Sequence, residues 1–461
     1  MKINKKLLLW LSPLSLSSIS LLAASCVGKT DKPSQGSDGN GSTENSNKIA
    51  NQWDTNITIV NSYINPGFKS ENDKGQGKIE KEFLTLLGQR FNEFKNLDQE
   101  TKNLPDVNFL IETNQDKDTF YSKLESNNNT LDLMIANYAT YLNSFADETG
   151  KVNNLNGVKL VAQTSTLKFN WQGADNDIYT TGTDTDKLRL TAQKNNESWV
   201  KNIGYEYPDW QKAVAKKTLN FDGSKFVEFY EKDKLTYVYH GAIYIAGNKQ
   251  QRDQIIQDWN NKDWEKFINH GITYRKNTSS GGYKYQVALL ARHFNKSLKE
   301  INEYFESNNS KVVKGQSIKD TLGKAHSSNI TPLIGFDDEG VYNWTNNVKN
   351  PEYFKPQGFQ SDQNYDNENN VVVRTLTITN PAAYDVVLAR PGISQKQANL
   401  ISKALNSLSL SENTYGIYTG YNKFQPIDFE TFQKFMYLQV QAETKNDKNV
   451  SIPEITNDTS N

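Results

Sequence analysis

Cysteine and histidine are nearly absent from this sequence. Among 461 residues there is one cysteine, Cys26, and there are four histidines. A single thiol cannot close a disulfide within the chain, so the fold must be stabilised without one. The histidines lie far apart, no His, Asp and Glu set has the spacing of metal ligands, and no serine or cysteine occupies a recognisable nucleophile motif. We therefore expect neither a metal site nor an enzyme.

The apolar stretch at the N-terminus is too short and too polar to span a membrane. It occupies residues 7–22, follows three lysines within the first six residues, and ends in small residues directly before Cys26. This order is typical of an export signal, although a buried N-terminal helix with an incidental cysteine is the alternative. We expect residues 1–25 to be removed and Cys26 to carry a diacylglyceryl group, whose two acyl chains suffice for firm anchoring. The protein would then be extracytoplasmic and attached to the cell membrane.

The chain has no excess of basic charge. Removal of residues 1–25 takes three lysines from 52 basic residues and none from 53 acidic residues, which leaves a net charge of −4. Without a basic domain we expect no nucleic-acid partner. The chain from about residue 51 to 442 is long enough for two or three domains. The 8 Trp, 23 Tyr and 21 Phe supply material for a core and a binding site, so we expect a folded chain.

Gly, Ser, Asn and Asp dominate both ends of the mature chain. Their composition predicts a flexible tether at residues 26–50 and a disordered tail at residues 444–461. Strand and helix signals alternate between these ends, which favours an α/β fold over a sandwich or a helical bundle. Strand-like runs occupy 57–60, 132–136, 237–246, 271–275 and 371–379, and helical patterns occupy 83–94, 283–294 and 394–408.

One glycine-rich turn carries the clearest chemistry. A short strand at 271–275 leads into a polar turn, and an amphipathic helix follows. Free backbone N–H groups, hydroxyls and the positive end of a helix would meet there, which is the chemistry that binds phosphate-like anions. The alternative is an ordinary connection in which a serine only caps the helix. The turn consists of Ser279, Ser280, Gly281, Gly282 and Tyr283.

Aromatic residues form a second candidate feature. Several tyrosines alternate with apolar residues around His240, and an acidic turn at 337–339 precedes Trp344. Such residues near strand ends suit a flat cationic ring, held by stacking and by cation–π attraction. The alternative is that each aromatic residue belongs to the core and that the acidic turn is a solvated β-turn.

The segment 272–283 resembles the strand and the Ser-Thr-Ser-Gly-Tyr turn of phosphonate-type solute-binding proteins of ABC importers, with Gly281 at the third hydroxyl position. Residues 239–243 are similar to the hinge strand of that family, with His240 where the family has arginine. Residues 131–138 resemble its strand that ends at the cleft, and residues 380–385 its returning segment.

A closer resemblance is to the extracytoplasmic thiamine-binding lipoproteins of mycoplasmas. The shared signatures extend from residue 51 to residue 422, nearly the whole mature chain. They lie at 51–54, 182–184, 259–267, 320–323, 339–340, 344–345, 379–381 with 384–386, and 414–416 with 420–422.

This resemblance implies an α/β, two-lobed fold of the type II periplasmic-binding-protein class, with a hinge and a ligand cleft between the lobes. It implies a first lobe at 51–235, a second lobe at 236–377 and a return to the first lobe at 378–443. The implied ligand is thiamine or its phosphates, with thiamine pyrophosphate as the expected form, carried as transported ligand rather than as cofactor. The implied partner is an ABC permease, and we expect a monomer.

The resemblance also implies site residues. The turn at 279–283 would hold the phosphate. The rings and the aminopyrimidine edge would be met by Asn137, Tyr138, Tyr239, His240, Tyr244, Asp337, Asp338, Trp344, Tyr384 and Asp385.

Three alternatives stay open. One is a binding protein for a phosphonate or another phosphorylated nutrient, which would use the anion site but not the rings. A second is a surface adhesin, and a third is an extracellular phosphohydrolase. Aspartates at 175–177 and 184–186 could hold Ca²⁺, but their spacing is not that of an EF-hand, and turn chemistry explains them better.

Overall fold

The computed structural model describes most of the chain that follows the expected export signal. The described residues are 49, 52–69, 77–114, 116–216, 227–307, 309–326, 329–343, 350, 352–361, 364–446, 450–453 and 455. Residues 1–25, Cys26, most of the expected tether and Trp344 lie outside the described residues. The chain divides into Met1–Glu44 and Asn45–Asn461, and every element below belongs to the second unit. No helix in the described ranges is long and apolar enough to cross a membrane.

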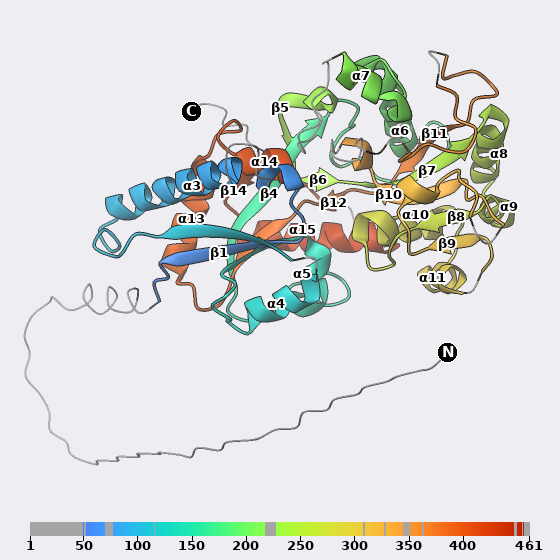
Figure 1. Ribbon diagram of the computed structural model, residues 1–461. Coiled ribbons are helices and arrows are strands. Elements are labelled where there is room, and N and C mark those ends of the chain that lie inside the picture. The colour runs from blue at the N-terminus through green and yellow to red at the C-terminus, as the bar shows by residue number, and fades with distance from the viewer. Residues whose placement is uncertain are drawn as a thin grey trace, which may run out of the picture. The chain divides into compact units, whose positions relative to one another are not determined.

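The first of two main sheets is mixed (Figure 1). Its strand order is β14-β4-β13-β3-β1-β2, and a seventh strand, β5, pairs with β4. The strands β2 and β3 lie parallel to β1, whereas β13 is antiparallel to both β3 and β4. The bounds are β1 (Asn56–Asn61), β2 (Asn108–Thr113), β3 (Leu133–Ala136), β4 (Lys159–Phe169), β5 (Tyr230–Thr236), β13 (Val386–Ala389) and β14 (Lys423–Gln425).

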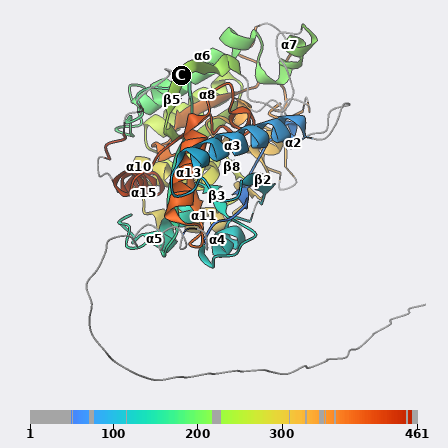
Figure 2. The ribbon, with the colours of Figure 1, turned by 90° about the vertical axis from the view of Figure 1, so that its left-hand side faces the viewer.

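Helices cover both faces of this first sheet because its central strands are apolar on both sides. In β3, Leu133 and Ile135 pack into one core, while Met134 and Ala136 pack into the core on the opposite face. The helices α3 and α13 lie side by side over the first of these cores (Figure 2). The helices of this lobe are α2 (Pro66–Lys69), α3 (Lys78–Leu97), α4 (Lys117–Glu125), α5 (Tyr138–Phe145), α13 (Gln395–Ser407), α14 (Thr414–Thr419) and α15 (Phe429–Glu443).

The second sheet has five strands in the order β11-β7-β10-β8-β9. Its interior strand β7, between β11 and β10, alternates in the same way, with Ala242 and Tyr244 in one core and Ile243 and Ile245 in the other. The strands are β7 (Gly241–Gly247), β8 (Ile272–Tyr274), β9 (Val312–Lys314), β10 (Ile334–Asp338) and β11 (Val372–Ile378). The helices of this second lobe are α8 (Lys249–Asn260), α9 (Trp264–Asn269), η3 (Ser280–Lys284), α10 (Tyr285–His293), α11 (Leu298–Glu306) and α12 (Ile318–Thr321).

Two short strands connect the lobes. The chain passes from β5 to β7 through β6 (Val238–Tyr239), and it returns from β11 to β13 through β12 (Ala382–Ala383). These two strands pair antiparallel, with Ala382 opposite Tyr239. Paired crossing strands of this kind can flex together, so they form the candidate hinge.

Helix α6 (Lys187–Ile203) requires a correction to the expected lobe boundaries. It packs on β11 of the second sheet, and Asn196 exchanges two hydrogen bonds with the backbone of Thr375, at 2.9 and 2.7 Å. The chain therefore crosses to the second lobe after β4 and comes back before β5. The expectation that all of residues 51–235 belong to one lobe is wrong for α6, and the remaining boundaries stay a prediction. The short elements α7 (Gln211–Ala215), η1 (Tyr207–Asp209), η2 (Val227–Phe229) and η4 (Val341–Asn343) complete the fold.

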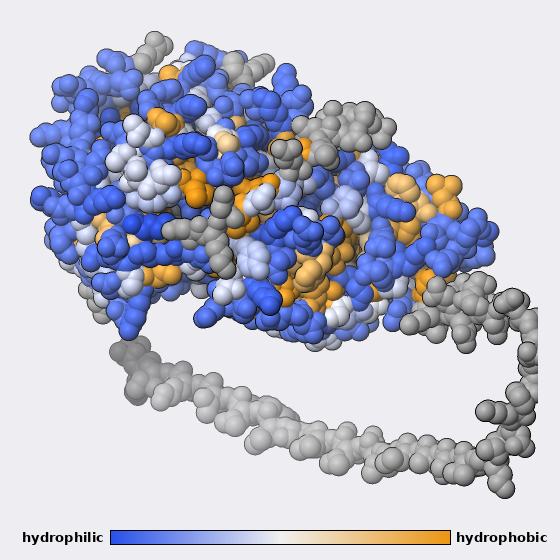
Figure 3. Space-filling model, turned by 180° about the vertical axis from the view of Figure 1, so that it is seen from behind, coloured by the Kyte–Doolittle hydropathy of each residue, from blue (hydrophilic) through white to orange (hydrophobic). Residues whose placement is uncertain are grey.

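Helix α15 contacts both lobes. It packs on α5 and β12 as well as on α10 and η3, and it lies between the two groups of elements in Figure 1. Beyond it, Val450, Ile452 and Ile455 pack against the core beneath α5, so a disordered tail is wrong for these residues. From behind, the exterior is mostly hydrophilic, with hydrophobic residues in patches between the hydrophilic ones (Figure 3).

Candidate functional site

A cavity of about 1160 Å³ lies between the two lobes. Its walls are formed by the chain that follows β3, by the far end of β4 and by the residues before β13 on the first lobe, and by η3 and the end of β10 on the second. The strand β6, which connects the lobes, also lines the cavity. Ligands of open α/β folds bind beyond strand ends in this way, and the volume is slightly above the usual range for ligand pockets, about 300–1,000 Å³.

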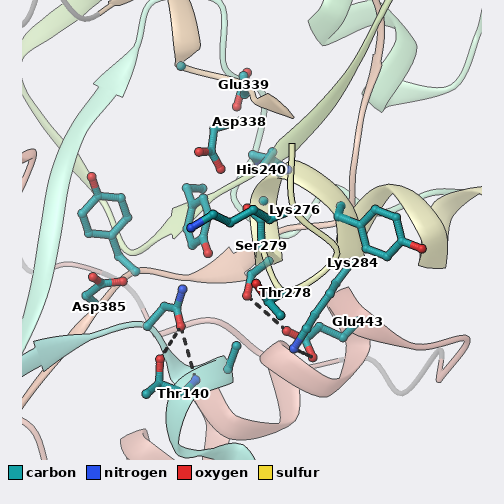
Figure 4. A pocket seen from close by; sticks show the side chains of 18 of the residues that line it. Thr140, His240, Lys276, Thr278, Ser279, Lys284, Asp338, Glu339, Asp385 and Glu443 are labelled. Carbon is teal, nitrogen blue, oxygen red and sulfur yellow. Dashed lines mark hydrogen bonds and ion pairs between the residues drawn. The ribbon is translucent and has the colours of Figure 1, made fainter. Parts of the chain in front are cut away.

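The predicted anion site is the start of a helix. The side chain of Ser279 accepts a hydrogen bond from the N–H of Gly282 at 3.2 Å and so caps η3, which continues without a break into α10. The first N–H groups of a helix have no carbonyl partner within it, and the helix dipole makes this end positive. Lys276 and Lys284 also line the cavity (Figure 4). We refer to residues 279–283 as the cradle.

Close approach of neighbouring atoms explains one glycine in the cradle, Gly281, and one beside it, Gly241. A Cβ atom on Gly281 would lie 1.8 Å from Oδ1 of Asp338, and one on Gly241 would lie 2.5 Å from the carbonyl oxygen of Gly281. Gln286 holds η3 against β7 and β10, because its Nε2 donates to the carbonyl oxygens of Gly281, Ala242 and Asp337 at 2.6, 3.0 and 3.0 Å. The sequence signal for Gln286 is a polar residue within the apolar helical pattern at 283–294.

The cradle hydroxyls already have partners. Ser280 donates to Oε1 of Glu443 at 3.4 Å, and the hydroxyl of Tyr283 donates to Asn302 at 2.9 Å. The cradle residues that line the cavity are Ser279, Ser280, Gly281 and Tyr283, whereas Gly282 lies behind them. The structure thus brings the five predicted residues together, with one of them in a supporting position.

Three of the aromatic residues that line the cavity, Tyr239, Tyr384 and Tyr421, form one group. The ring of Tyr384 is nearly perpendicular to those of Tyr239 and Tyr421, with ring centroids 5.8 Å apart in each pair. The hydroxyl of Tyr421 also donates to Oδ2 of Asp385 at 2.5 Å. Tyr421 was not among the predicted site residues, although it lies in one of the shared signatures. Edge-to-face rings of this kind leave flat surfaces for a stacked ligand.

Carboxylates gather beside these rings. The enclosed position of Asp338 in the cleft raises the pKa of its carboxyl to about 6, although the side chain remains accessible to water; Lys117 lowers this pKa. Burial raises the pKa of Asp385 and of Glu339, and the latter accepts a hydrogen bond from Nε1 of Trp171 at 2.8 Å. A cationic group bound here would favour the ionised form of each carboxyl.

Asn137 and His240 add polar groups to the cavity. The side-chain oxygen of Asn137 caps α5 by accepting from the N–H and hydroxyl of Thr140, at 3.3 and 3.1 Å, so its amide nitrogen is left to donate into the cleft. Nδ1 of His240 lies 2.7 Å from the carbonyl oxygen of Thr379. The carbonyl requires a proton on Nδ1, and Nε2 of the neutral ring is therefore an acceptor.

Some predicted site residues do not line the cavity. Tyr138 is fully buried between the rings of Phe432 and Phe435, and its hydroxyl donates to Gln163 at 2.7 Å. Tyr244 is equally buried, and its hydroxyl donates to the carbonyl oxygen of Asp338 at 2.8 Å. The expectation that these two rings face the ligand is wrong: helical and strand geometry turns both into the cores.

Asp337 does not line the cavity either. Its Oδ1 accepts from the N–H of Asp338 at 2.9 Å, and burial together with the charge of Asp338 raises its pKa to about 7. Trp344 lies outside the described residues. Among the aspartates at 175–186, Asp186 stabilises a turn, since its Oδ2 accepts from three successive N–H groups, at 180–182, at 2.9 Å each. Asp175 and Asp184 instead form ion pairs with Lys168 and Arg189. Within the described ranges no group of three or more His, Cys, Asp or Glu could hold a metal ion.

Two mixed sheets, paired connecting strands and a polar cleft between the lobes define a solute-binding protein of the two-lobed class. A family described as extracytoplasmic thiamine-binding lipoprotein matches residues 81–440. The chain is also 30% identical over 390 residues to the high affinity transport system protein p37 of Mesomycoplasma hyorhinis, which covers 83% of this chain and 87% of that protein. The protein therefore belongs to the family of extracytoplasmic thiamine-binding lipoproteins.

Further comparisons agree with this placement. The p37 protein of Mycoplasma pneumoniae is 28% identical over 303 residues, which is 64% of this chain and 74% of that protein. The solved structure of Mh-p37 from Mycoplasma hyorhinis, described as a candidate thiamine pyrophosphate transporter, superposes with a TM-score of 0.70 at 27% identity, covering 85% of this chain and 99% of that one.

Proposed function

We propose that this protein is the binding component of an ABC importer, and that it holds thiamine pyrophosphate in the cleft and delivers it to a permease. The observation that carries the proposal is the two-sided chemistry of one cavity. The cradle, Lys276 and Lys284 line it on the second lobe, where Asp338 lies next to the cradle. Tyr384, Tyr421 and Asp385 line it on the first lobe. Thiamine pyrophosphate combines a diphosphate with a cationic thiazolium and an aminopyrimidine, so it needs both.

The diphosphate would lie at the cradle. The cradle is the start of η3 and lines this part of the cavity. An anion at a helix N-terminus is stabilised by the dipole. Lys276 makes no ion pair with any other residue that the structure describes, so its ammonium group remains available to a phosphate. Charge-assisted hydrogen bonds to phosphate oxygens are about twice as strong as neutral ones.

The two rings would lie against Tyr239, Tyr384 and Tyr421. A cation over such a ring gains about 0.5–2 kcal/mol, more when water is excluded. Asp338 and Asp385 lie beside the same rings and would offset the thiazolium charge. The amide nitrogen of Asn137 and the acceptor Nε2 of His240 suit the ring nitrogens and the amino group of an aminopyrimidine.

Closure would follow from binding at both walls. The cradle belongs to the second lobe, whereas Tyr384, Asp385 and Asn137 belong to the first lobe or to its junction with the hinge. A ligand that contacts both lobes binds the closed form better than the open form and shifts the population toward it. The closed form would be the one that the permease accepts.

A phosphonate or another phosphorylated nutrient is the second candidate ligand. The cradle and its lysines favour it, because they need only an anion. Such a ligand would leave Tyr384, Tyr421 and Asp385 of the first lobe without a partner. We therefore place thiamine pyrophosphate first.

The anchor is part of the proposal. The family places the protein outside the cytoplasm, and we propose that a diacylglyceryl group on Cys26 attaches it to the cell membrane. Residues 27–48 would connect this lipid to the first described residue, Ile49. The binding protein would act as a monomer.

Mass spectrometry of the protein purified natively from its own cell tests ligand and anchor together. We expect one thiamine pyrophosphate per chain, displaced by added thiamine pyrophosphate but not by methylphosphonate at the same concentration. After denaturation, we expect the N-terminal peptide to begin at Cys26 and to carry the mass of a diacylglyceryl group. A bound phosphonate would select the second candidate, and an unmodified Cys26 would contradict the anchor.

A further inference from the structure

The carboxylate of Glu443 occupies the cradle. Glu443 is the last residue of α15, and its side chain extends to the start of η3 (Figure 4). Its Oε1 accepts a hydrogen bond from Oγ of Ser280, and its Oε2 lies near Nζ of Lys284, both at 3.4 Å. All three residues line the cavity. An internal anion therefore stands at the helix start, where the proposed function places the phosphate.

The partners of Glu443 are the same groups that a phosphate would need. Ser280 supplies the cradle hydroxyl that donates, and Lys284 supplies positive charge one helical turn further on. Two anions on one hydroxyl and one ammonium group repel each other strongly at such short range. Both contacts of Glu443 are long for charge-assisted bonds, so an incoming anion of higher charge can replace them.

The structure confines this exchange to one side chain. The backbone at the end of α15 is fixed, because Nη2 of Arg292 donates to the carbonyl oxygen of Gln441 at 2.8 Å and Oγ1 of Thr444 donates to that of Val440 at 2.7 Å. Nε2 of Gln439, one turn earlier, donates to Oε1 of Glu443 at 2.9 Å. This contact comes from the same helix and can follow the carboxylate as it turns away from Ser280.

We propose that Glu443 is a specificity-determining residue that competes with the ligand for the cradle, so that only a multiply charged group such as a diphosphate displaces it. The inference rests on the proposed function and states how that site selects its ligand by charge. A singly charged anion gains too little from Ser280 and Lys284 to replace an anion already in place. A diphosphate carries more charge and more acceptor oxygens, and it gains more from the same groups.

Titration calorimetry on Glu443→Gln tests the proposal with three probes: inorganic pyrophosphate, thiamine pyrophosphate and thiamine. The substitution keeps the size of the side chain and its acceptor oxygen but removes the charge. We expect pyrophosphate and thiamine pyrophosphate to bind about tenfold more tightly, the size expected for the loss of a like charge at a few ångströms in a partly solvated cleft. Thiamine, which has no phosphate, should bind as it does to the wild type.

Glu306→Gln is the matched control. Glu306 lines the same cavity and accepts a hydrogen bond from Tyr274 at 2.9 Å, but it has no contact with Ser280 or Lys284. Its substitution reports the general effect of removing one negative charge from the cleft, and we expect it to change pyrophosphate affinity less than twofold. Matching unfolding temperatures would show that each variant is folded.

A Lys284→Met substitution adds a second readout. Glu443 offsets the charge of Lys284 in the wild type, so losing this lysine should weaken pyrophosphate binding less there than in Glu443→Gln. Unchanged or weaker pyrophosphate binding by Glu443→Gln would overturn the inference and show that Glu443 supports the cradle. If the wild type binds no thiamine pyrophosphate but Glu443→Gln binds pyrophosphate, the proposed function fails while the competition stands. Failure of both proteins to bind pyrophosphate would overturn both.

Discussion

At the residue scale, Asp338 shows how the cleft changes the pKa of a carboxyl group. Its carboxyl lies against Gly281 and Tyr239, between the cradle and the rings. The pKa of about 6 means that the folded protein holds this proton at pH values where the unfolded chain, with a pKa near 3.8, has lost it. The folded state therefore binds more protons between about pH 4 and 6, and this carboxyl makes the free energy of unfolding fall as the pH rises through that range.

The same shift predicts how ligand binding depends on pH. A cationic ring attracts the ionised form of Asp338, which is about a tenth of the population at pH 5 and most of it at pH 7.5 for a pKa of about 6. Thiamine affinity should therefore rise by up to about tenfold over this interval. Calorimetry at several pH values measures it.

Asp338→Asn is the control, because the titration of the ligand itself remains in this variant. We expect its affinity for thiamine to be lower at pH 7.5 and its pH dependence to be smaller. A pH profile that matches the wild type would place the positive ring away from Asp338.

The difference between Asn137 and Tyr138 shows what sequence reasoning could not separate. Both lie at the end of β3, as the resemblance implied, but only the asparagine faces the cleft. Aromatic residues suit a core and a ring-binding wall equally well, so their presence near a strand end does not choose between the two. The spacing of Tyr138, Tyr141 and Phe145 on α5 is that of a buried helical stripe, and all three are indeed buried.

At the element scale, two serines at the start of the helical segment η3 have separate roles: Ser279 is its N-cap and Ser280 is its first residue. Ser279 caps the helix through the N–H of Gly282, whereas the hydroxyl of Ser280 faces the cavity and Glu443. Ser279→Ala should lower the free energy of unfolding by about 1 kcal/mol, as the loss of an N-cap does. Ser280→Ala should leave stability nearly unchanged and weaken thiamine pyrophosphate binding by up to about tenfold.

Thermal unfolding and calorimetry together separate these tasks. Thiamine is the control ligand, because it makes no phosphate contact and should bind Ser280→Ala normally. Equal losses for both ligands would mean that the substitution damages the fold. No loss for either ligand would place the phosphate elsewhere and leave the turn as an ordinary helix cap.

Helix α6 marks the limit of what local patterns reveal about elements. Sequence signals located the strands at 57–60 and 132–136, the helix at 83–94 and the turn at 279–283, because each has its own apolar period or turn chemistry. A helix pattern shows that one face is buried, but not against which sheet. The bonds that place α6 on β11 join Asn196 to Thr375, residues far apart in sequence. A local sequence pattern therefore cannot predict a pairing of this kind.

At the scale of the whole molecule, function depends on two lobes, one hinge and one bridging helix. The strands β6 and β12 carry the chain between the lobes, while α15 contacts both. Tyr239 in β6 bonds to Tyr285 of α10 at 2.8 Å, and Nε2 of Gln439 in α15 donates to the same Tyr285 hydroxyl at 3.0 Å. Movement at the hinge is therefore coupled to the helix whose last residue stands at the cradle.

The central claim is that one ligand is held by both lobes, with its diphosphate at the cradle and its rings at the opposite wall. Small-angle scattering of the protein with saturating thiamine pyrophosphate, thiamine or inorganic pyrophosphate tests it most directly. Thiamine pyrophosphate reaches both walls, so it should close the cleft and lower the radius of gyration, whereas either half alone should do so less. An unchanged scattering curve at saturating thiamine pyrophosphate would contradict the account.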